Sequence, residues 1–252
     1  MSGHSKWSTI KHKKAASDAR RGKVFSKMAR EIMVAARSGG GDPSANITLR
    51  SLIQKARTYN MPADNIERAI KKGTGEGGGA ALEEMTYEGF APGGVAIIVQ
   101  VLTDNRNRSA AEVRHLFNKH GASMASQGSV SRGFRRKGRI VVPAGAVDED
   151  RLMELVIEAG GEDLAREGDG FAITTEPAAF MDVVDALNAA GIAPEESEVG
   201  LVPESSVPVR DRGAAAVLLR FVEALEDLDD VQGVATNMDV DDAILESLAE
   251  ES

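Results

Sequence analysis

Residues 139–203, RIVVPAGAVDEDRLMELVIEAGGEDLAREGDGFAITTEPAAFMDVVDALNAAGIAPEESEVGLVP, decide the fold, because strand-like and helix-like spacing of apolar residues alternate along them. Apolar residues at helical spacing predict two helices, over 152–159 and 180–187, which end at Gly160 and Gly191. Short β-branched runs predict four strands near residues 140–142, 163–167, 170–175 and 197–202. The resulting order, β-α-β-β-α-β, is typical of a ferredoxin-like sandwich.

The segments on either side of this unit are incomplete. Residues 81–138 begin with an apolar strand predicted at Val95–Leu102. A helix follows, opened by a capping pair of Ser109 and Glu112, and a short strand is predicted around Ser129–Phe134. Residues 204–240 supply one more helix and a last strand near Val231–Asn237. We therefore predict an α+β fold in which an acidic α/β domain, 139–203, is inserted into a second ferredoxin-like domain made of 81–138 plus 204–240. Three consecutive domains are the alternative, which leaves two fragments too small to cover a sheet face.

Residues 1–80 predict a basic helical domain at the N-terminal end of the chain. Helical spacing of apolar residues predicts helices over about Lys23–Ser38, Pro43–Thr58 and Pro62–Gly73. The glycine-rich residues 73–80 read as a flexible linker to the α/β part. At the other end, residues 241–252 form an acidic tail, and the chain is expected to fray from residue 239 onward.

Charge divides the chain more sharply than hydropathy does. Residues 1–139 contain 25 Lys and Arg against 11 Asp and Glu, whereas residues 140–252 contain 5 against 28. The overall net charge of −9 therefore conceals a strongly basic first half. Concentrated positive charge attracts polyanions, and nucleic acid is the most common of these in cells. The acidic half would repel nucleic acid, orient the molecule or meet a basic protein partner.

Several other classes of protein are disfavoured. The chain has no cysteine, which excludes disulfides, thiolate metal sites and a cysteine nucleophile and suits the cytoplasm. No apolar run is long enough to span a membrane, and the basic N-terminus resembles an organelle transit peptide only faintly. The glycines at 73–79 lack the Lys-Ser/Thr of a phosphate-binding loop, and the four histidines lack metal-ligand spacing. We therefore expect no enzyme activity, no cofactor and no metal site.

The candidate binding residues are cations of the basic half, expected to contact phosphates because base-reading Asn and Gln are few. They are Lys6, Lys11, His12, Lys13, Lys14, Arg20, Arg21, Lys23, Arg68, Lys71, Lys72, Arg106, Arg108, Arg135, Arg136 and Lys137. The loop Asn105–Arg108 would add a helix N-terminus, which also attracts anions, although Asn could serve turn geometry alone. If about six phosphates are neutralised, affinity should fall on the order of a thousandfold between low and moderate salt.

Two aromatic residues lie among these cations. Phe134 begins a stretch like the aromatic strand of an RNA recognition motif, but no second aromatic follows two positions later, so base stacking there is disfavoured. Trp7 could stack on a base or anchor the N-terminal arm to the helical domain, and the anchor is the favoured interpretation.

Five separated motifs resemble the YebC family. They are Gly3–Lys14, Asn60–Pro62 with Asn65–Gly73, Tyr87–Phe90 with Pro92–Gly94, Thr103–Arg108 and Ala224–Gln232. The resemblance implies a three-domain cytoplasmic protein with a helical N-terminal domain and two ferredoxin-like domains. Family members are described as transcriptional regulators that bind DNA, mitochondrial relatives as translational activators, and some bacterial members as ribosome-associated factors.

Three hypotheses follow for function. The first is a DNA-binding transcriptional regulator, and the second is a translation factor that associates with ribosomal or messenger RNA. The third is a protein-interaction module or enzyme, for which reversing the basic charges would leave activity intact. The residues themselves support a polyanion binder and do not separate DNA from RNA.

Overall fold

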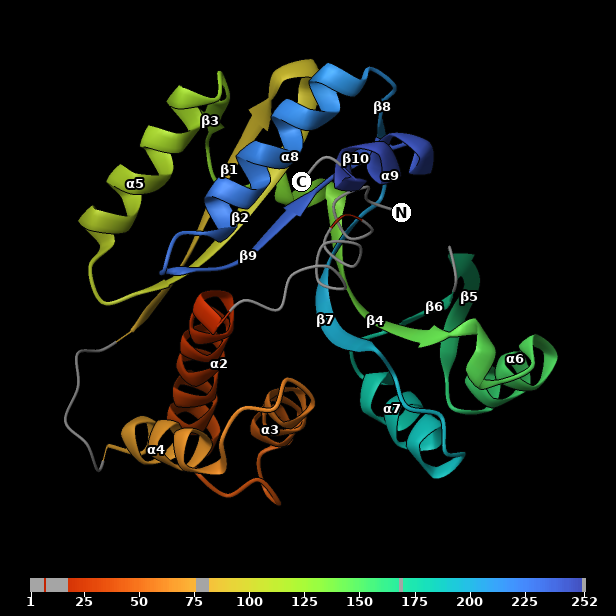
Figure 1. Ribbon diagram of the computed structural model, residues 1–252. Helices are drawn as coiled ribbons and strands as arrows, with labels where there is room; N and C mark the ends of the chain where they lie inside the picture. Colours follow the sequence, from red (N-terminus) through yellow and green to blue (C-terminus); the bar gives the residue numbers. More distant parts are fainter. Residues whose placement is uncertain (1–6, 8–17, 76–81, 168–169, 251–252) are drawn as a thin grey trace. The chain divides into compact units, whose positions relative to one another are not determined.

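Figure 1 shows the computed structural model, which describes residue 7 and residues 18–75, 82–167 and 170–250. The chain forms two compact units: one contains residues up to Phe134 and from Pro203 onward, and the other is Arg135–Val202. The structure confirms the predicted fold class, with helices first and then antiparallel sheets, one α/β unit interrupting another. Most of the predicted linker 73–80 lies outside the described residues.

Three helices form the start of the first unit: α2 (Asp18–Gly39), α3 (Ile47–Thr58) and α4 (Ala63–Gly73). Their apolar faces share one small core that includes Met28, Ile32, Leu49, Ile53 and Ile66. Asn46 joins α2 to α3. Its side-chain oxygen caps α3 by accepting from Leu49 N at 3.0 Å, and its amide donates to Ala35 O and Gly40 O, each at 2.8 Å. A single buried amide thus satisfies groups of two helix ends.

Gly73 allows α4 to approach the backbone of α2 closely. A Cβ at this position would lie 2.4 Å from Met33 O and 2.8 Å from Ala36 Cβ. Gly73→Ala is therefore expected to destabilise the protein by about 1–3 kcal/mol through overpacking. Gly22→Ala, in an exposed part of α2 with nothing within 4 Å, should instead stabilise it by about 0.5–1 kcal/mol. Urea unfolding of both variants checks the prediction, and equal effects of the same sign would contradict it.

The first unit is completed by a four-stranded sheet of order β3-β1-β2-β9. Its strands are β1 (Glu83–Ala91), β2 (Val95–Thr103), β3 (Ser123–Ala125) and β9 (Val231–Thr236). Helices α5 (Arg106–Lys119) and α8 (Arg212–Glu226) pack on one face, where Phe117 and Phe221 meet edge to face at 5.2 Å. Strand β9 and helix α8 come from beyond the inserted unit, so the returning chain supplies pieces that 81–138 lacks.

Two parts of this sheet differ from the sequence prediction. The sequence prediction lacks strand β1, although Met85 and Tyr87 alternate with polar residues along it and pack against the core. The strand predicted around Ser129–Phe134 is wrong, because residues 131–133 form a 3₁₀ turn. The buried carboxylate of Glu88 explains this turn. It accepts from the N–H groups of Gly128, Val130 and Ser131 at 2.8, 2.6 and 3.0 Å, which a strand would have used in a ladder.

Glu88 also makes an acid-sensitive contribution to stability. Burial would raise its pKa, but hydrogen bonds from the three backbone N–H groups and from the Ser131 side chain outweigh burial and lower the pKa below its ordinary value. The stabilisation is therefore present above about pH 4.5 and is lost as the pH falls through the lowered folded value. Glu88→Gln should cost about 1–3 kcal/mol at neutral pH and should lose less further stability on acidification than the wild type.

Urea unfolding at several pH values measures this difference. Glu84→Gln is the matched control, because Glu84 is exposed on the same strand. Parallel pH profiles of Glu88→Gln and the wild type would contradict the assignment.

Residues 239–250 belong mostly to a regular strand and helix, so the prediction that the chain frays from residue 239 is wrong. β10 (Met238–Val240) pairs in parallel with β8 (Val207–Val209), and α9 (Asp242–Glu250) follows. Leu245 is fully buried in the main core, with Ile244 and Leu248 packed beside it. The helical spacing of these three apolar residues is the pattern in the sequence that indicates a helix, and the acidic composition of the segment obscured it.

The second unit has the predicted β-α-β-β-α-β order. Its elements are β4 (Phe134–Pro143), α6 (Glu149–Glu158), β5 (Gly161–Glu167), β6 (Gly170–Thr175), α7 (Phe180–Ala189) and β7 (Glu196–Pro203). The strand order β5-β6-β4-β7 places the two central strands antiparallel. Both helices contribute to a core built around Ile140, Val142, Phe171 and Ile173.

Candidate nucleic-acid interface

Helices α3 and α4 expose cations because their apolar stripes are buried. On α3, Leu49, Ile53 and Ala56 face inward, which leaves Arg50 and Arg57 exposed. On α4, Ile66, Ala69 and Gly73 face inward, and the exposed side carries Arg68, Lys71 and Lys72. We call Arg50, Arg57, Arg68, Lys71 and Lys72 the α3–α4 cationic face. Arg50 and Arg57 were missed from the sequence, although seven residues apart on a helix places them on one side.

The cations of this face have few acidic partners. Within the described part of the chain, no carboxylate forms an ion pair with Arg50, Arg57, Lys71 or Lys72. Arg68 donates to Asp64 O at 3.1 Å and to Asn65 Oδ1, which orients its guanidinium along α4 without neutralising it. The segment 18–75 contains 12 Lys and Arg against 5 Asp and Glu. The positive charge of the α3–α4 cationic face is therefore available to an external anion.

The cations of α2 are placed differently. Lys23, predicted to hold phosphate, lies 3.1 Å from Asp227 Oδ1 and also donates to Asp227 O at 3.3 Å. Lys27 donates to Glu226 O at 2.6 Å, and Arg30 donates to Asp229 O and, at 3.0 Å, to Asp230 Oδ1. The segment Glu226–Asp230 comes from the acidic half of the sequence. That half therefore covers part of the basic half inside one unit.

The segment Asn105–Arg108 is the start of a helix and not a loop. Asn105 caps α5 by accepting from Arg108 N at 3.1 Å, so the predicted capping pair of Ser109 and Glu112 is wrong. Arg106 is exposed in the first turn, 3.5 Å from Glu83. Ser109 is buried and donates to Asp230 instead. Arg106 can reach an anion, while Ser109 is part of the internal network.

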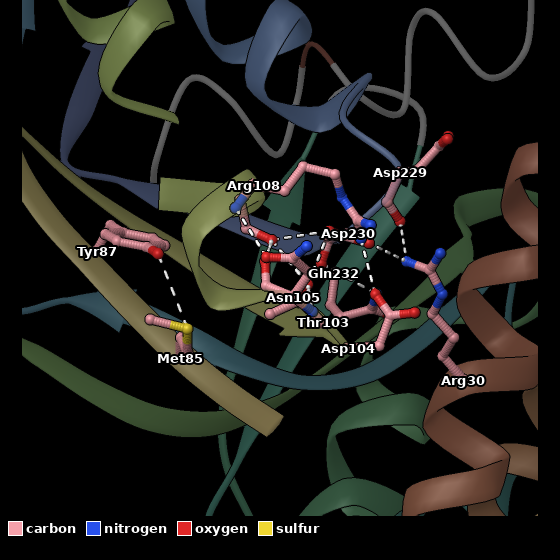
Figure 2. A network of polar contacts seen from close by, with 11 residues as sticks. Arg30, Met85, Tyr87, Thr103, Asp104, Asn105, Arg108, Asp229, Asp230 and Gln232 are labelled. Carbon is pink, nitrogen blue, oxygen red and sulfur yellow. Dashed lines mark hydrogen bonds and ion pairs between the residues drawn. The ribbon is translucent and has the colours of Figure 1, made fainter. Parts of the chain in front are cut away.

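Asp230 is the centre of a polar network that joins three elements (Figure 2). Its Oδ2 accepts from Arg108 Nη2 at 2.7 Å, Ser109 Oγ at 2.7 Å and Thr103 Oγ1 at 2.9 Å, while its Oδ1 accepts from Arg30. Burial would raise the pKa of Asp230, but the hydrogen bonds outweigh burial and lower the pKa below its ordinary value. The carboxylate therefore stays ionised. The hydrogen bonds that Arg108 donates to Asp230 and Asp104 raise the pKa of its guanidinium. Arg108 therefore serves this network more than a phosphate.

The remaining candidates divide between the second unit and the undescribed residues. Arg135 and Arg136 are exposed at the start of β4 in the second unit, whereas Lys137 is paired with Glu162 and Glu176. The backbones of Arg20 and Arg21 belong to α2. The predictions for Lys6, Lys11, His12, Lys13 and Lys14 lie outside the described residues.

The two aromatic residues weighed from the sequence are both buried. Phe134 is 7% exposed, which fits a core position. Trp7 is 6% exposed and donates from Nε1 to Glu223 Oε1 of α8 at 2.7 Å. Trp7 is thus an anchor, as favoured, but it joins the core under α8 rather than the helical segment as predicted. Among the described residues, no three acidic or histidine side chains gather as metal ligands, and no helix could cross a bilayer.

Comparison with known proteins covers nearly the whole chain. Residues 5–76 match the model for the TACO1/YebC protein N-terminal domain, and residues 82–238 match that for the TACO1/YebC second and third domain. A relative in Rubrobacter xylanophilus, named a probable transcriptional regulatory protein, is 52% identical over 99% of this chain and 100% of its own. A relative of the same name in Acidithiobacillus ferrooxidans is 54% identical over 96% of both chains.

A solved structure agrees with these matches. The crystal structure of a conserved hypothetical protein from Aquifex aeolicus is 47% identical and covers 89% of this chain and 93% of its own, with a TM-score of 0.82. Apart from Gly3 and His4, the motifs that resembled the family in the sequence lie within the matched ranges. The chain therefore belongs to the TACO1/YebC family.

Proposed function

We propose that this protein is a non-enzymatic regulator of gene expression that binds nucleic acid through phosphate contacts. The observation that carries the proposal is the α3–α4 cationic face, where exposed cations lack ion-pair partners among the described residues. A folded protein gains little by leaving such charges together unless an anion meets them. The names of the relatives, which are regulatory rather than enzymatic, agree with this reading.

The binding surface is proposed to extend beyond that face. The cations outside it that remain candidates are Lys6, Lys11, His12, Lys13, Lys14, Arg20, Arg21, Arg106, Arg135 and Arg136. Arg108, Lys23 and Lys137 contribute less in the free protein because each is ion-paired internally. Phosphate contacts of this kind set affinity and position, and they carry little sequence information.

The favoured target is DNA in a transcriptional role, because the relatives are named probable transcriptional regulatory proteins. RNA in a translational role is the alternative, and one feature of the exposed helices favours it. Gln54 is the only exposed Asn or Gln within α3 or α4, so direct base reading by these helices is limited. Recognition by backbone shape is how proteins commonly bind structured RNA.

Crosslinking in cells followed by sequencing of the bound nucleic acid tests the proposal. Promoter DNA as the main product supports the transcriptional role and excludes the translational one. Ribosomal or messenger RNA gives the opposite result. If neither is recovered, and purified folded protein binds neither DNA nor RNA in dilute buffer, nucleic-acid binding itself is rejected.

A further inference from the structure

Three cations form a ridge along α2 that the α3–α4 cationic face does not include. Lys23, Lys27 and Arg30 are four and three residues apart, so they lie on one side of the helix and span roughly 10 Å. All three point at the segment Glu226–Asp230, which contains four acidic residues in five. The ridge resembles the exposed cationic face in composition, but each of its cations is bonded to this segment.

We propose that Lys23, Lys27 and Arg30 form a second, covered site for a phosphodiester backbone, which Glu226–Asp230 occupies in the free protein as a phosphate mimic. This inference rests on the proposed function, because the same polyanion must reach both sites. Binding at the exposed α3–α4 face would bring phosphates near α2, where they compete with the covering segment. The covered site then adds contacts only after the segment has been displaced.

The covering segment has the chemistry of a short polyanion. It follows the C-terminus of α8, where unpaired carbonyl groups carry partial negative charge. Main-chain oxygens of Glu226, Asp227 and Asp229 accept from the three cations, and carboxylates of Asp227 and Asp230 add full charges. A row of oxygens at this spacing offers α2 the same kind of acceptors as a phosphate strand.

The outer contacts of the cover are weak enough to exchange. The Lys23 and Asp227 side chains are 48% and 70% exposed, and ion pairs between such groups contribute little to stability. Lys27 donates to a neutral carbonyl. Burial lowers its pKa below the ordinary value even though Glu226 and Asp227 raise it, so its charge is incompletely compensated. A phosphate oxygen would compensate this ammonium better than the carbonyl does.

The inner contact can also open without leaving a buried charge unpaired. If Arg30 turns to a phosphate, Asp230 keeps its hydrogen bonds from Arg108, Ser109 and Thr103. Arg30, whose side chain is 25% exposed in the covered state, gains a new anion. The usual penalty for breaking a buried pair, an orphaned charge, therefore does not arise on the Asp230 side.

Binding measurements with a short DNA duplex and an RNA hairpin test the covered site. Asp227→Asn combined with Asp229→Asn removes two negative charges from the cover, one of them paired with Lys23, and should tighten binding about three- to tenfold. Glu154→Gln combined with Glu158→Gln removes the same charge from exposed positions on α6 and is the matched control. Lys27→Gln should weaken binding several-fold and reduce the slope of log affinity against log salt by about one. Arg151→Gln, on α6, should change neither the affinity nor the slope.

Displacement of the cover is measured by spin labels. The chain has no cysteine, so Ser26→Cys on α2 and Arg220→Cys on α8, both exposed, can be labelled specifically. The distance between the labels should increase or broaden when nucleic acid saturates the protein. If the protein binds but the distance stays fixed and Lys27→Gln binds like wild type, the covered site is rejected while the proposed function survives. If no nucleic acid binds, both are rejected.

Discussion

Replacing Asp230 with asparagine is expected to lower the free energy of unfolding by about 2–4 kcal/mol, because a buried, fully bonded carboxylate loses its charge. Oδ2 accepts three hydrogen bonds and Oδ1 a fourth, so an amide NH₂ in either orientation faces donors. The hydroxyl groups of Ser109 and Thr103 are buried, so water cannot replace the carboxylate as their hydrogen-bond acceptor. The substitution therefore weakens hydrogen bonds from β2, α5 and α2 at the same time.

Urea unfolding at neutral pH measures this loss, and Asp229→Asn is the matched control. Asp229 is the adjacent residue, but it is exposed and offers Arg30 its main-chain oxygen, which the substitution keeps. Asp229→Asn should change the free energy of unfolding by less than about 0.5 kcal/mol. Equal effects of the two variants would show that Asp230 is not the centre of the network.

Asp230 also predicts how the protein responds to acid. Its folded pKa lies below the ordinary value of about 3.8, so its stabilisation is complete above that pH and is lost as the pH falls further. The Asp230→Asn variant should lack this part of the acid transition. A profile with the full wild-type slope below pH 4 would place the acid-sensitive group elsewhere.

The sequence predicted elements best where burial is one-sided. The second unit shows regular spacing of apolar residues, and its six elements appear in the predicted order. The errors occur where a single side chain reaches across the chain. The Glu88 carboxylate accepts from the N–H groups of Gly128, Val130 and Ser131, and Asp230 accepts from the hydroxyl of Ser109, so neither the turn nor the cap follows its local sequence pattern. Contacts between residues 40 to 121 positions apart have no local signal in the sequence.

The charge split carries a prediction about function and none about geometry. It indicated a polyanion binder, and it could not show that Glu226–Asp230 folds back on α2. Counting charges treats every cation in the basic half alike. The structure separates exposed cations that have no acidic partner in the described part of the chain, such as Arg50 and Lys71, from cations already bonded within the protein, such as Lys23 and Arg108. That separation determines which substitutions should affect binding most.

Replacing Arg50, Arg57 and Lys71 together with glutamine is expected to weaken nucleic-acid binding on the order of a hundredfold at about 0.1 M salt. Each phosphate contact releases about one counterion, so losing three should reduce the slope of log affinity against log salt by nearly three. All three side chains are exposed and have no described ion pair, which keeps the effect on folding small.

The matched control replaces Arg151, Arg166 and Arg220 with glutamine, which removes the same charge from exposed positions of the acidic half. Fluorescence anisotropy with labelled duplex DNA and an RNA hairpin, between about 50 and 200 mM salt, gives both affinity and slope. A general effect of net charge would weaken both variants alike. A local phosphate contact weakens only the first, and its slope falls because counterion release depends on the phosphates touched and not on total charge.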